Sequence, residues 1–192
     1  MNRFLALGDS YTVGEGVDPA EAWPGQLAAV LGLQSTVVAS TGWTSRELLT
    51  ALDAQPPVGP FELVSLSIGV NDQYRGLSRS EFADNAAALL DRATGWATRG
   101  VLIVSIPDWG VTPFAEGRDR ALVAAEVDAF NADLAQLAGG RGVPFVDVTP
   151  LSRSSPAEVT GDGLHPSASQ YQTWVQLIAP VVVAMLSGTV PA

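Results

Sequence analysis

The stretch FLALGDSYTVGEG, residues 4–16, decides how the chain begins to fold. Its first four residues, Phe4–Leu7, are apolar, and the run stops at Gly8-Asp9-Ser10 before the sequence becomes polar and glycine-rich. A short apolar run that is bounded by turn residues is typical of a buried strand. Ser10 then has two interpretations, either as the N-cap of the next helix or as a reactive serine presented at the end of the strand.

Four more apolar runs follow the first one, and helical patterns separate them. They are Thr36–Ala39, Leu63–Ile68, Val101–Ile106 and Phe145–Val148. Nearly continuous apolarity with β-branched residues suits strands that are buried on both faces, as in a parallel sheet. Strand and helix alternate five times with no break in composition. This predicts a single domain over residues 1–192, of the α/β class, built as a three-layer α/β/α sandwich around a five-stranded parallel sheet.

Local patterns mark the helices between the runs. Apolar residues spaced four and three apart from Val123 to Leu137 predict an amphipathic helix that ends near Gly139-Gly140. Pro180 is expected to kink or end the last helix. Capping-box spacings predict three other helix starts, at Thr44 with Glu47, at Ser78 with Glu81 and at Ser167 with Gln170.

The composition excludes several kinds of chemistry. All ten basic residues are arginine, which excludes a P-loop and a Schiff-base mechanism because both need lysine. The chain has no cysteine and only one histidine, His165, so thiol chemistry and a multi-histidine metal site are excluded too. The formal net charge of −10 repels phosphate backbones, and we expect no nucleic-acid partner.

The apolar segments are too short for a membrane protein. The longest uninterrupted run, Leu177–Leu186, falls far below the roughly 20 residues that a spanning helix needs. After Arg3 only Phe4–Leu7 are apolar before polar residues follow, which does not fit a signal peptide. We therefore expect a cytoplasmic protein without stable membrane insertion. The sequence gives no indication of the oligomeric state.

Ligands of open α/β sheets bind outside the carboxyl ends of the strands, so the residues just after each run are candidates for a site. Gly42 in STGWTS follows the second run, and its backbone N–H can approach a substrate with no Cβ in the way. Asn71 in SIGVND follows the third run, where its carboxamide either stabilises an oxyanion or forms an ordinary Asn-Asp turn.

The end of the chain offers a partner for a reactive serine. In GDGLHPSASQY, His165 stands three residues after Asp162. A serine hydroxyl is a poor nucleophile unless an adjacent base, usually histidine, takes its proton, and a carboxylate commonly orients that base. Taken alone, His165 also fits an ordinary surface loop.

Together these segments resemble a known family. GDS at residues 8–10, the glycine at 42, GVND at residues 69–72 and DGLH at residues 162–165 are similar, in order and over essentially the whole chain, to the four blocks of the SGNH or GDSL hydrolases. The resemblance implies a flavodoxin-like fold and hydrolysis of a small-molecule acyl ester without a cofactor or metal. Short-chain acyl or acetyl esters are among the substrates that it implies.

The resemblance also implies a role for each matching residue. Ser10 is the nucleophile, His165 is the general base, and Asp162 orients His165. The oxyanion hole consists of the backbone N–H of Ser10, the backbone N–H of Gly42 and the side chain of Asn71.

The sequence departs from the family pattern at two places. GDSY replaces the common GDSL, so Tyr11 follows the expected nucleophile, and VVAST precedes Gly42 where relatives often carry an asparagine. Because of the second departure, the sequence does not indicate which residue holds the Gly42 N–H in position. Trp109 and Phe114 in PDWGVTPFAEG are expected either to line a pocket or to pack locally within their loop.

Three alternatives remain at this stage. A thioesterase or a lysophospholipase of the same family needs the same catalytic residues. A catalytically silent binding module is possible on the same fold, because a fold does not dictate activity. Finally, four aspartates near strand ends suit a magnesium site or a phosphoacceptor of a receiver-like domain, although the absence of lysine argues against the receiver and against lysine-assisted phosphoryl transfer. They are Asp9, Asp72, Asp108 and Asp147.

Overall fold

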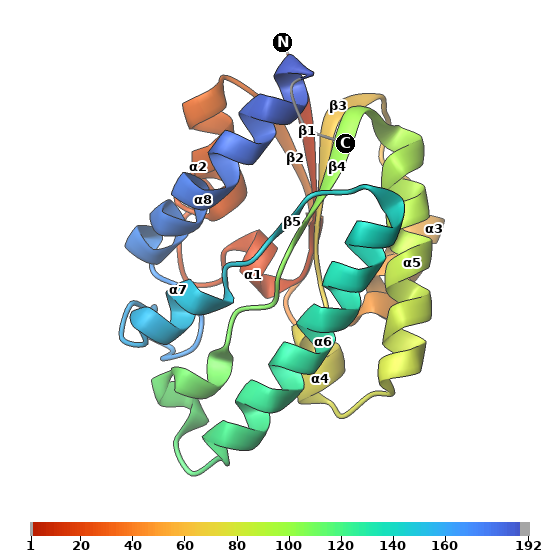
Figure 1. Ribbon diagram of the computed structural model, residues 1–192. Coiled ribbons are helices and arrows are strands. Elements are labelled where there is room, and N and C mark those ends of the chain that lie inside the picture. Colours follow the sequence, from red (N-terminus) through yellow and green to blue (C-terminus); the bar gives the residue numbers. More distant parts are fainter. Residues whose placement is uncertain (1, 189–192) are drawn as a thin grey trace.

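The computed structural model describes residues 2–188, which form a five-stranded parallel sheet between two layers of helices (Figure 1). Residues 1 and 189–192 of the expected domain lie outside the described residues. The strand order is β2-β1-β3-β4-β5, and all neighbouring strands are parallel. This is the order of flavodoxin-like sheets. The predicted α/β/α sandwich is therefore confirmed.

The five apolar runs correspond to the five strands. The strands are β1 (Arg3–Gly8), β2 (Gln34–Ala39), β3 (Phe61–Ser67), β4 (Ala97–Val104) and β5 (Phe145–Val146). The α-helices are α1 (Ser10–Val13), α2 (Trp23–Leu31), α3 (Ser45–Ala54), α4 (Val70–Tyr74), α5 (Arg79–Trp96), α6 (Arg120–Arg141), α7 (Thr149–Ser154) and α8 (Ala168–Ser187). Two short 3₁₀ helices, η1 (Trp109–Val111) and η2 (Pro113–Ala115), follow β4.

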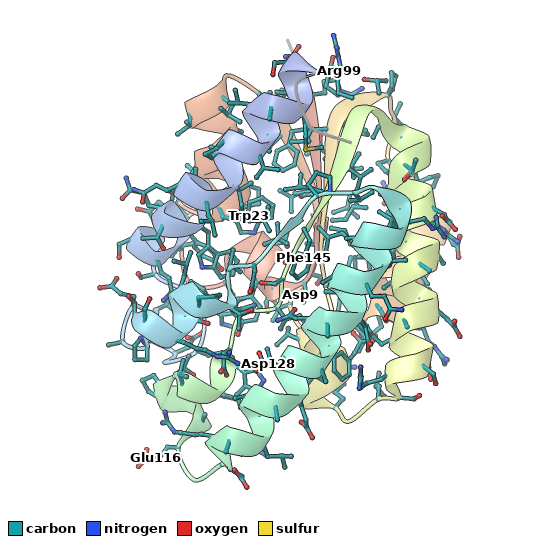
Figure 2. The ribbon with its side chains drawn as sticks, viewed as in Figure 1. Asp9, Trp23, Arg99, Glu116, Asp128 and Phe145 are labelled. Carbon is teal, nitrogen blue, oxygen red and sulfur yellow. The ribbon has the colours of Figure 1, made fainter. Side chains whose placement is uncertain are left out.

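Large apolar side chains fill the space on both sides of the sheet. In Figure 1 the sheet is seen nearly edge-on, with α2 and α8 over one face and α5 and α6 over the other. Trp23 of α2 and Trp174 of α8 are fully buried in the first layer, and Figure 2 shows Trp23 pointing inward. Phe82 and Phe130 pack in the second layer with ring centroids 4.8 Å apart. Burial of one large apolar side chain stabilises a fold by about 1.5–3 kcal/mol.

The structure corrects one expectation about the strands. β2 is not buried on both faces, since all six of its residues are exposed or half-buried and Val37 keeps 45% of its surface. The reason is topological, because β2 is an edge strand with β1 as its only neighbour in the sheet. A run of apolar residues is compatible with an edge position as well as with a central one.

The structure also shows where two of the expected helices end. α6 runs through Gly139-Gly140 to Arg141 and ends at Gly142. Gly142 has a φ of 63°, a left-handed conformation that suits glycine, and its N–H donates to the last carbonyl groups of the helix. α8 does not end at Pro180 but continues to Ser187.

The three predicted helix starts are present, but only one has a complete capping box. Thr44 and Glu47 bond reciprocally at the start of α3. Ser78 and Ser167 cap α5 and α8 from their side chains. Their expected partners bond elsewhere: Glu81 pairs with Arg46, and Gln170 donates to the Ser155 carbonyl.

The carboxyl ends of the strands lie at one edge of the sheet, at the bottom of Figure 1, together with α1, α4 and the loop that carries η1 and η2. In Figure 2 Asp9 lies close to this edge and Arg99 lies at the opposite end of the molecule. None of the helices within residues 2–188 is long and apolar enough to cross a membrane.

Candidate active site

Ser10 begins helix α1 but does not cap it. The N-cap is Asp9, whose Oδ1 accepts a hydrogen bond from the Tyr11 N–H at 3.0 Å. The interpretation of Ser10 as an N-cap is therefore wrong. Instead, the Ser10 Oγ lies 2.9 Å from the Nε2 of His165, in hydrogen-bond contact across 155 positions of sequence.

Asp162 holds the other side of the His165 ring, with 2.6 Å between its Oδ2 and the Nδ1 of His165. Its Oδ1 accepts hydrogen bonds from the backbone N–H groups of Leu164 and His165 and from the Thr160 hydroxyl. Partial burial raises the pKa of Asp162, but the His165 side chain and these donors outweigh it and bring the pKa to about 2. Since an ionised carboxylate can only accept, Nδ1 carries the proton and Nε2 faces Ser10 as an acceptor.

Tyr11 supports the His165 ring from within the core. Its side chain is buried, and its ring centroid lies 5.2 Å from that of His165 and 6.4 Å from that of Trp174. The residue that departs from the common GDSL pattern thus forms a packing surface for the imidazole and adds no charged group beside it.

Gly42 and Asn71 lie beside Ser10 at the ends of the two neighbouring strands. All three line one cavity together with His165. The Asn71 Nδ2 donates one hydrogen bond to the Trp43 carbonyl at 2.9 Å. A carboxamide nitrogen has two hydrogens, so this bond orients the group and leaves a second donor. The structure therefore brings all five predicted site residues together.

Residues of α4 and its C-cap hold the loop of residues 42–45 at successive positions. Gly42 has a φ of 82°, which favours glycine, and this backbone is fixed from outside the loop. The bonds run from Arg75 Nη2 to the Gly42 carbonyl at 2.6 Å, from Asn71 to the Trp43 carbonyl, and from the Ser45 N–H to Asp72 at 2.9 Å. Arg75 and Asp72 thus hold the backbone of the loop that carries Gly42. They do so in a sequence without the asparagine that relatives often have before this glycine.

Sequence reasoning missed both of these supporting residues. Arg75 stands four residues after Asn71, so the two side chains share one face of a helical turn, and this spacing could have indicated a common target. Asp72 was considered only as a metal ligand or phosphoacceptor. In the structure its carboxylate accepts from the Ser45 N–H and also from the Ser45 hydroxyl at 2.5 Å.

Two carboxyl groups near Ser10 lie in a different environment from Asp162. Burial raises the pKa of Asp9 to about 7, although the Tyr11 N–H lowers it, and the nearby charge of Asp72 raises it further. Burial also raises the pKa of Asp72, against the hydrogen bonds from Ser45. Asp162 is thus the one of these three carboxyl groups whose pKa is lowered.

The four aspartates of the magnesium alternative have separate partners. Asp9 caps α1 and Asp72 binds Ser45, as described above. Asp108 forms an ion pair with Arg153 at 2.8 Å, and Asp147 accepts from the Ser105 hydroxyl. Within residues 2–188 no three His, Asp or Glu side chains are grouped so that they could hold a metal ion.

The cavity beside Ser10 has a volume of about 160 Å³. Trp109 and Phe114, the two aromatic residues expected either in a pocket wall or in local packing, both line it and lie 6.1 Å apart between ring centroids. A larger hollow of about 510 Å³ includes Arg99, at the opposite end of the molecule (Figure 2). That hollow contains none of the predicted site residues.

Solved structures with similar folds cover nearly the whole chain. A lipolytic protein of the G-D-S-L family from Veillonella parvula has a TM-score of 0.78 at 17% identity, covering 95% of this chain and 99% of that one. A carbohydrate acetylesterase family member from Sinorhizobium meliloti has a TM-score of 0.74 at 22% identity, covering 97% and 100%. TesA has a TM-score of 0.73 at 22% identity, covering 96% and 99%. These likenesses define the fold as that of the SGNH hydrolases.

The family follows from the sequence itself. The profile of the GDSL-like lipase/acylhydrolase family matches residues 6–173, and the chain belongs to this family. The predicted family and the predicted hydrolase class of enzyme are thereby confirmed. No curated protein matches the chain.

Proposed function

We propose that the domain of residues 1–192 hydrolyses carboxylic esters with Ser10 as nucleophile, His165 as general base and Asp162 as the residue that orients the imidazole. The observation that carries this proposal is the unbroken hydrogen-bond chain from Asp162 through His165 to Ser10, with distances of 2.6 and 2.9 Å. Such a chain activates a serine because the imidazole can take the hydroxyl proton as the oxygen attacks.

The first half of the reaction forms an acyl-enzyme. The Ser10 Oγ attacks the carbonyl carbon of the ester while its proton passes to the Nε2 of His165. When the tetrahedral intermediate collapses, the bond to the alcohol oxygen breaks, and His165 returns the proton to that oxygen. Asp162 stays ionised throughout and stabilises the imidazolium, in keeping with its low pKa.

The second half releases the acid. Water attacks the acyl-enzyme carbonyl, gives one proton to the Nε2 of His165, and expels the Ser10 oxygen, which recovers that proton. The carboxylic acid leaves and the free enzyme is regenerated. Both halves pass through an intermediate with a negatively charged oxygen.

We assign three donors to this oxyanion: the backbone N–H of Ser10, the backbone N–H of Gly42 and the second amide hydrogen of Asn71. The shared cavity of these residues and the fixed orientation of the Asn71 carboxamide support the assignment. Donors held in place before the reaction cost no reorganisation as charge develops, which makes them efficient stabilisers of the transition state.

The proposal is tested by Ser10→Ala, with p-nitrophenyl acetate and p-nitrophenyl butyrate as substrates. We expect kcat to fall by about 10⁴–10⁶ while the melting temperature is kept, because Asp9 rather than Ser10 caps α1. Ser35→Ala on the exposed part of β2 is the matched control and should keep full activity. A fluorophosphonate should label the wild-type protein and the Ser35→Ala variant but not Ser10→Ala. Turnover by Ser10→Ala at the wild-type rate would refute the mechanism.

The same chemistry allows a thioester or a lysophospholipid as the acyl donor, since only the leaving group differs. Acyl-coenzyme A and lysophosphatidylcholine of matched acyl length, assayed beside the p-nitrophenyl ester, distinguish the three. We expect the simple ester to give the highest kcat/KM. Labelling at Ser10 without turnover of any of the three would instead favour the silent binding module.

A further inference from the structure

The cavity beside Ser10 has a size and a lining that suit one part of an ester. We propose that it is an acyl pocket for groups of up to about six non-hydrogen atoms, and that Trp109 sets this limit. The inference rests on the ester hydrolysis proposed above. It narrows the substrate class to esters of short, apolar carboxylic acids.

The volume gives the limit on length. An apolar protein cavity of roughly 150 Å³ holds one benzene molecule, which has six carbon atoms. The cavity here measures about 160 Å³ and includes the reacting atoms of Ser10 and His165 on its wall. Acetyl, propionyl and butyryl groups fit into this space together with their carbonyl oxygen, whereas an octanoyl group exceeds it.

The lining gives the chemical character. Beyond the catalytic residues and Thr41, whose hydroxyl donates to Glu15, the wall consists of apolar or aromatic side chains, namely Tyr11, Val70, Tyr74, Trp109, Phe114 and Leu164. The only polar side-chain atom of Trp109, its Nε1, donates to the Gln73 side chain at 2.7 Å and is not available to a ligand. Such a wall favours hydrocarbon and offers little to the hydroxyl groups of a sugar.

The positions of the donors and the base indicate which part of the ester enters. The carbonyl oxygen faces Gly42 and Asn71, and the leaving oxygen lies near the Nε2 of His165, from which it receives its proton. The acyl chain then packs against Val70 and Trp109, two apolar side chains that line the same cavity. Val70 directly precedes Asn71 on α4, so this part of the wall adjoins the oxyanion donors.

One part of the cavity wall, at Trp109, is buried and hydrogen-bonded, and another part, at Tyr74 and Phe114, is exposed to solvent. Trp109 is only 4% exposed, and Gln73, which accepts its hydrogen bond, is itself bound to Glu126 at 2.7 Å. Tyr74 and Phe114 keep 45% and 43% of their surface exposed. A side chain that is buried and bonded cannot move aside for a longer chain at low cost, so the limit on acyl length lies at Trp109.

The test compares p-nitrophenyl acetate, butyrate, hexanoate and octanoate at concentrations below micelle formation. One methylene that does not fit an apolar pocket costs about tenfold or more in kcat/KM, so we expect a steep fall beyond butyrate. Trp109→Leu should reduce the ratio of butyrate to octanoate kcat/KM by about tenfold. Val70→Ala enlarges the same pocket by a smaller change and should shift the ratio in the same direction, which keeps the test valid if Trp109→Leu folds poorly.

Trp96→Leu is the matched control, because Trp96 lies at the end of α5 and does not line the cavity. It should leave the ratio unchanged. The inference is overturned if kcat/KM of the wild type stays level or rises through octanoate, or if neither pocket variant changes the ratio. It is also overturned if both variants alter only the dependence on alcohol size, measured with methyl, phenyl and naphthyl acetates. Failure of the wild type to hydrolyse any of these esters would contradict the proposed function itself.

Discussion

Two loops meet at Ser10, and an aspartate holds each of them in a different way. Asp162 anchors the loop of His165, and 41% of its side-chain surface is exposed. Asp72 anchors the loop of residues 42–45 from a buried position, with 1% exposure. The pKa of Asp162 is lowered to about 2, while burial raises that of Asp72. The carboxylate beside the imidazole thus lies near solvent and several donors, whereas the carboxylate that accepts from the backbone and the hydroxyl of Ser45 is buried.

The largest effects are expected at the His165 loop. His165→Ala removes the only imidazole and should lower kcat by about 10⁴–10⁶. Asp162→Asn should lower kcat by up to about 10⁴, because the amide favours the wrong tautomer, but by no more than His165→Ala. The measurement is kcat with p-nitrophenyl butyrate. If Asp162→Asn kept the wild-type kcat, another group would orient the ring and a dyad would replace the triad.

The next effect concerns the donor that α4 supplies. Asn71→Ala should lower kcat by about 10²–10³ with a small change in KM, because an oxyanion donor acts mainly on the transition state. Steady-state kinetics over a range of ester concentrations separate the two constants. A loss confined to KM would remove Asn71 from the oxyanion hole and leave it as a support for the Trp43 carbonyl.

A smaller effect is expected where the loop of residues 42–45 is held from outside. Arg75→Ala removes the bond to the Gly42 carbonyl and should lower kcat about tenfold, the value of one hydrogen bond to a charged group. Added guanidinium should restore part of this loss, and Arg75→Lys should lose less than Arg75→Ala. Arg79→Ala is the control, because this exposed arginine pairs with Asp133, away from the loop. Equal losses in the Arg75 and Arg79 variants would show that general surface charge is responsible.

The smallest effects concern the dependence of stability on pH. As the pH rises, the exposed carboxyl group of Asp162 adds to stability, whereas the buried carboxyl group of Asp9 reduces it. Asp162 has a lowered pKa, so its contribution to stability is complete above about pH 4 and is lost as the pH falls toward 2. Asp9 keeps its proton in the folded state up to about pH 7, whereas the unfolded chain releases it near pH 4. Its contribution to stability therefore falls as the pH rises from about 4 to 7.

Melting temperatures of Asp9→Asn test the buried case. Asparagine keeps the N-cap acceptor for α1 but carries no charge, so the variant should gain more relative to wild type at pH 8 than at pH 5. Ser35→Ala serves as the reference for a neutral surface change. An equal difference from wild type at both pH values would mean that Asp9 titrates in the folded protein as it does in the unfolded chain.

The fold was predictable from the sequence because its central strands are short, apolar and bounded by turn residues. Such segments have few alternatives to a buried parallel sheet. The exposure of β2 was not predictable, since an edge position results from the strand order and not from the strand's own residues. The end of α6 was predictable only to within about two residues, because Gly139, Gly140 and Gly142 are similar signals until the backbone selects one of them.

The candidate site was predictable where strand ends carry motif residues, namely at Ser10, Gly42, Asn71 and the pair Asp162 and His165. Their roles stay predictions, although the structure brings these residues together. Arg75 and Asp72 act through contacts with a loop that is about 30 positions earlier in the sequence, and no local pattern specifies such contacts. The aromatic wall could be proposed from Trp109 and Phe114, but the volume of the cavity depends on five separate segments of chain.

The hydrogen bond between Ser10 and His165 also determines when the chain can become active during its synthesis. A ribosome makes Ser10 first and His165 only after 154 further residues. His165 stands just before α8, which packs against α2 in the folded protein. By the proposed mechanism, a nascent chain therefore carries an inert serine, and a translation product that ends before His165 should not hydrolyse esters.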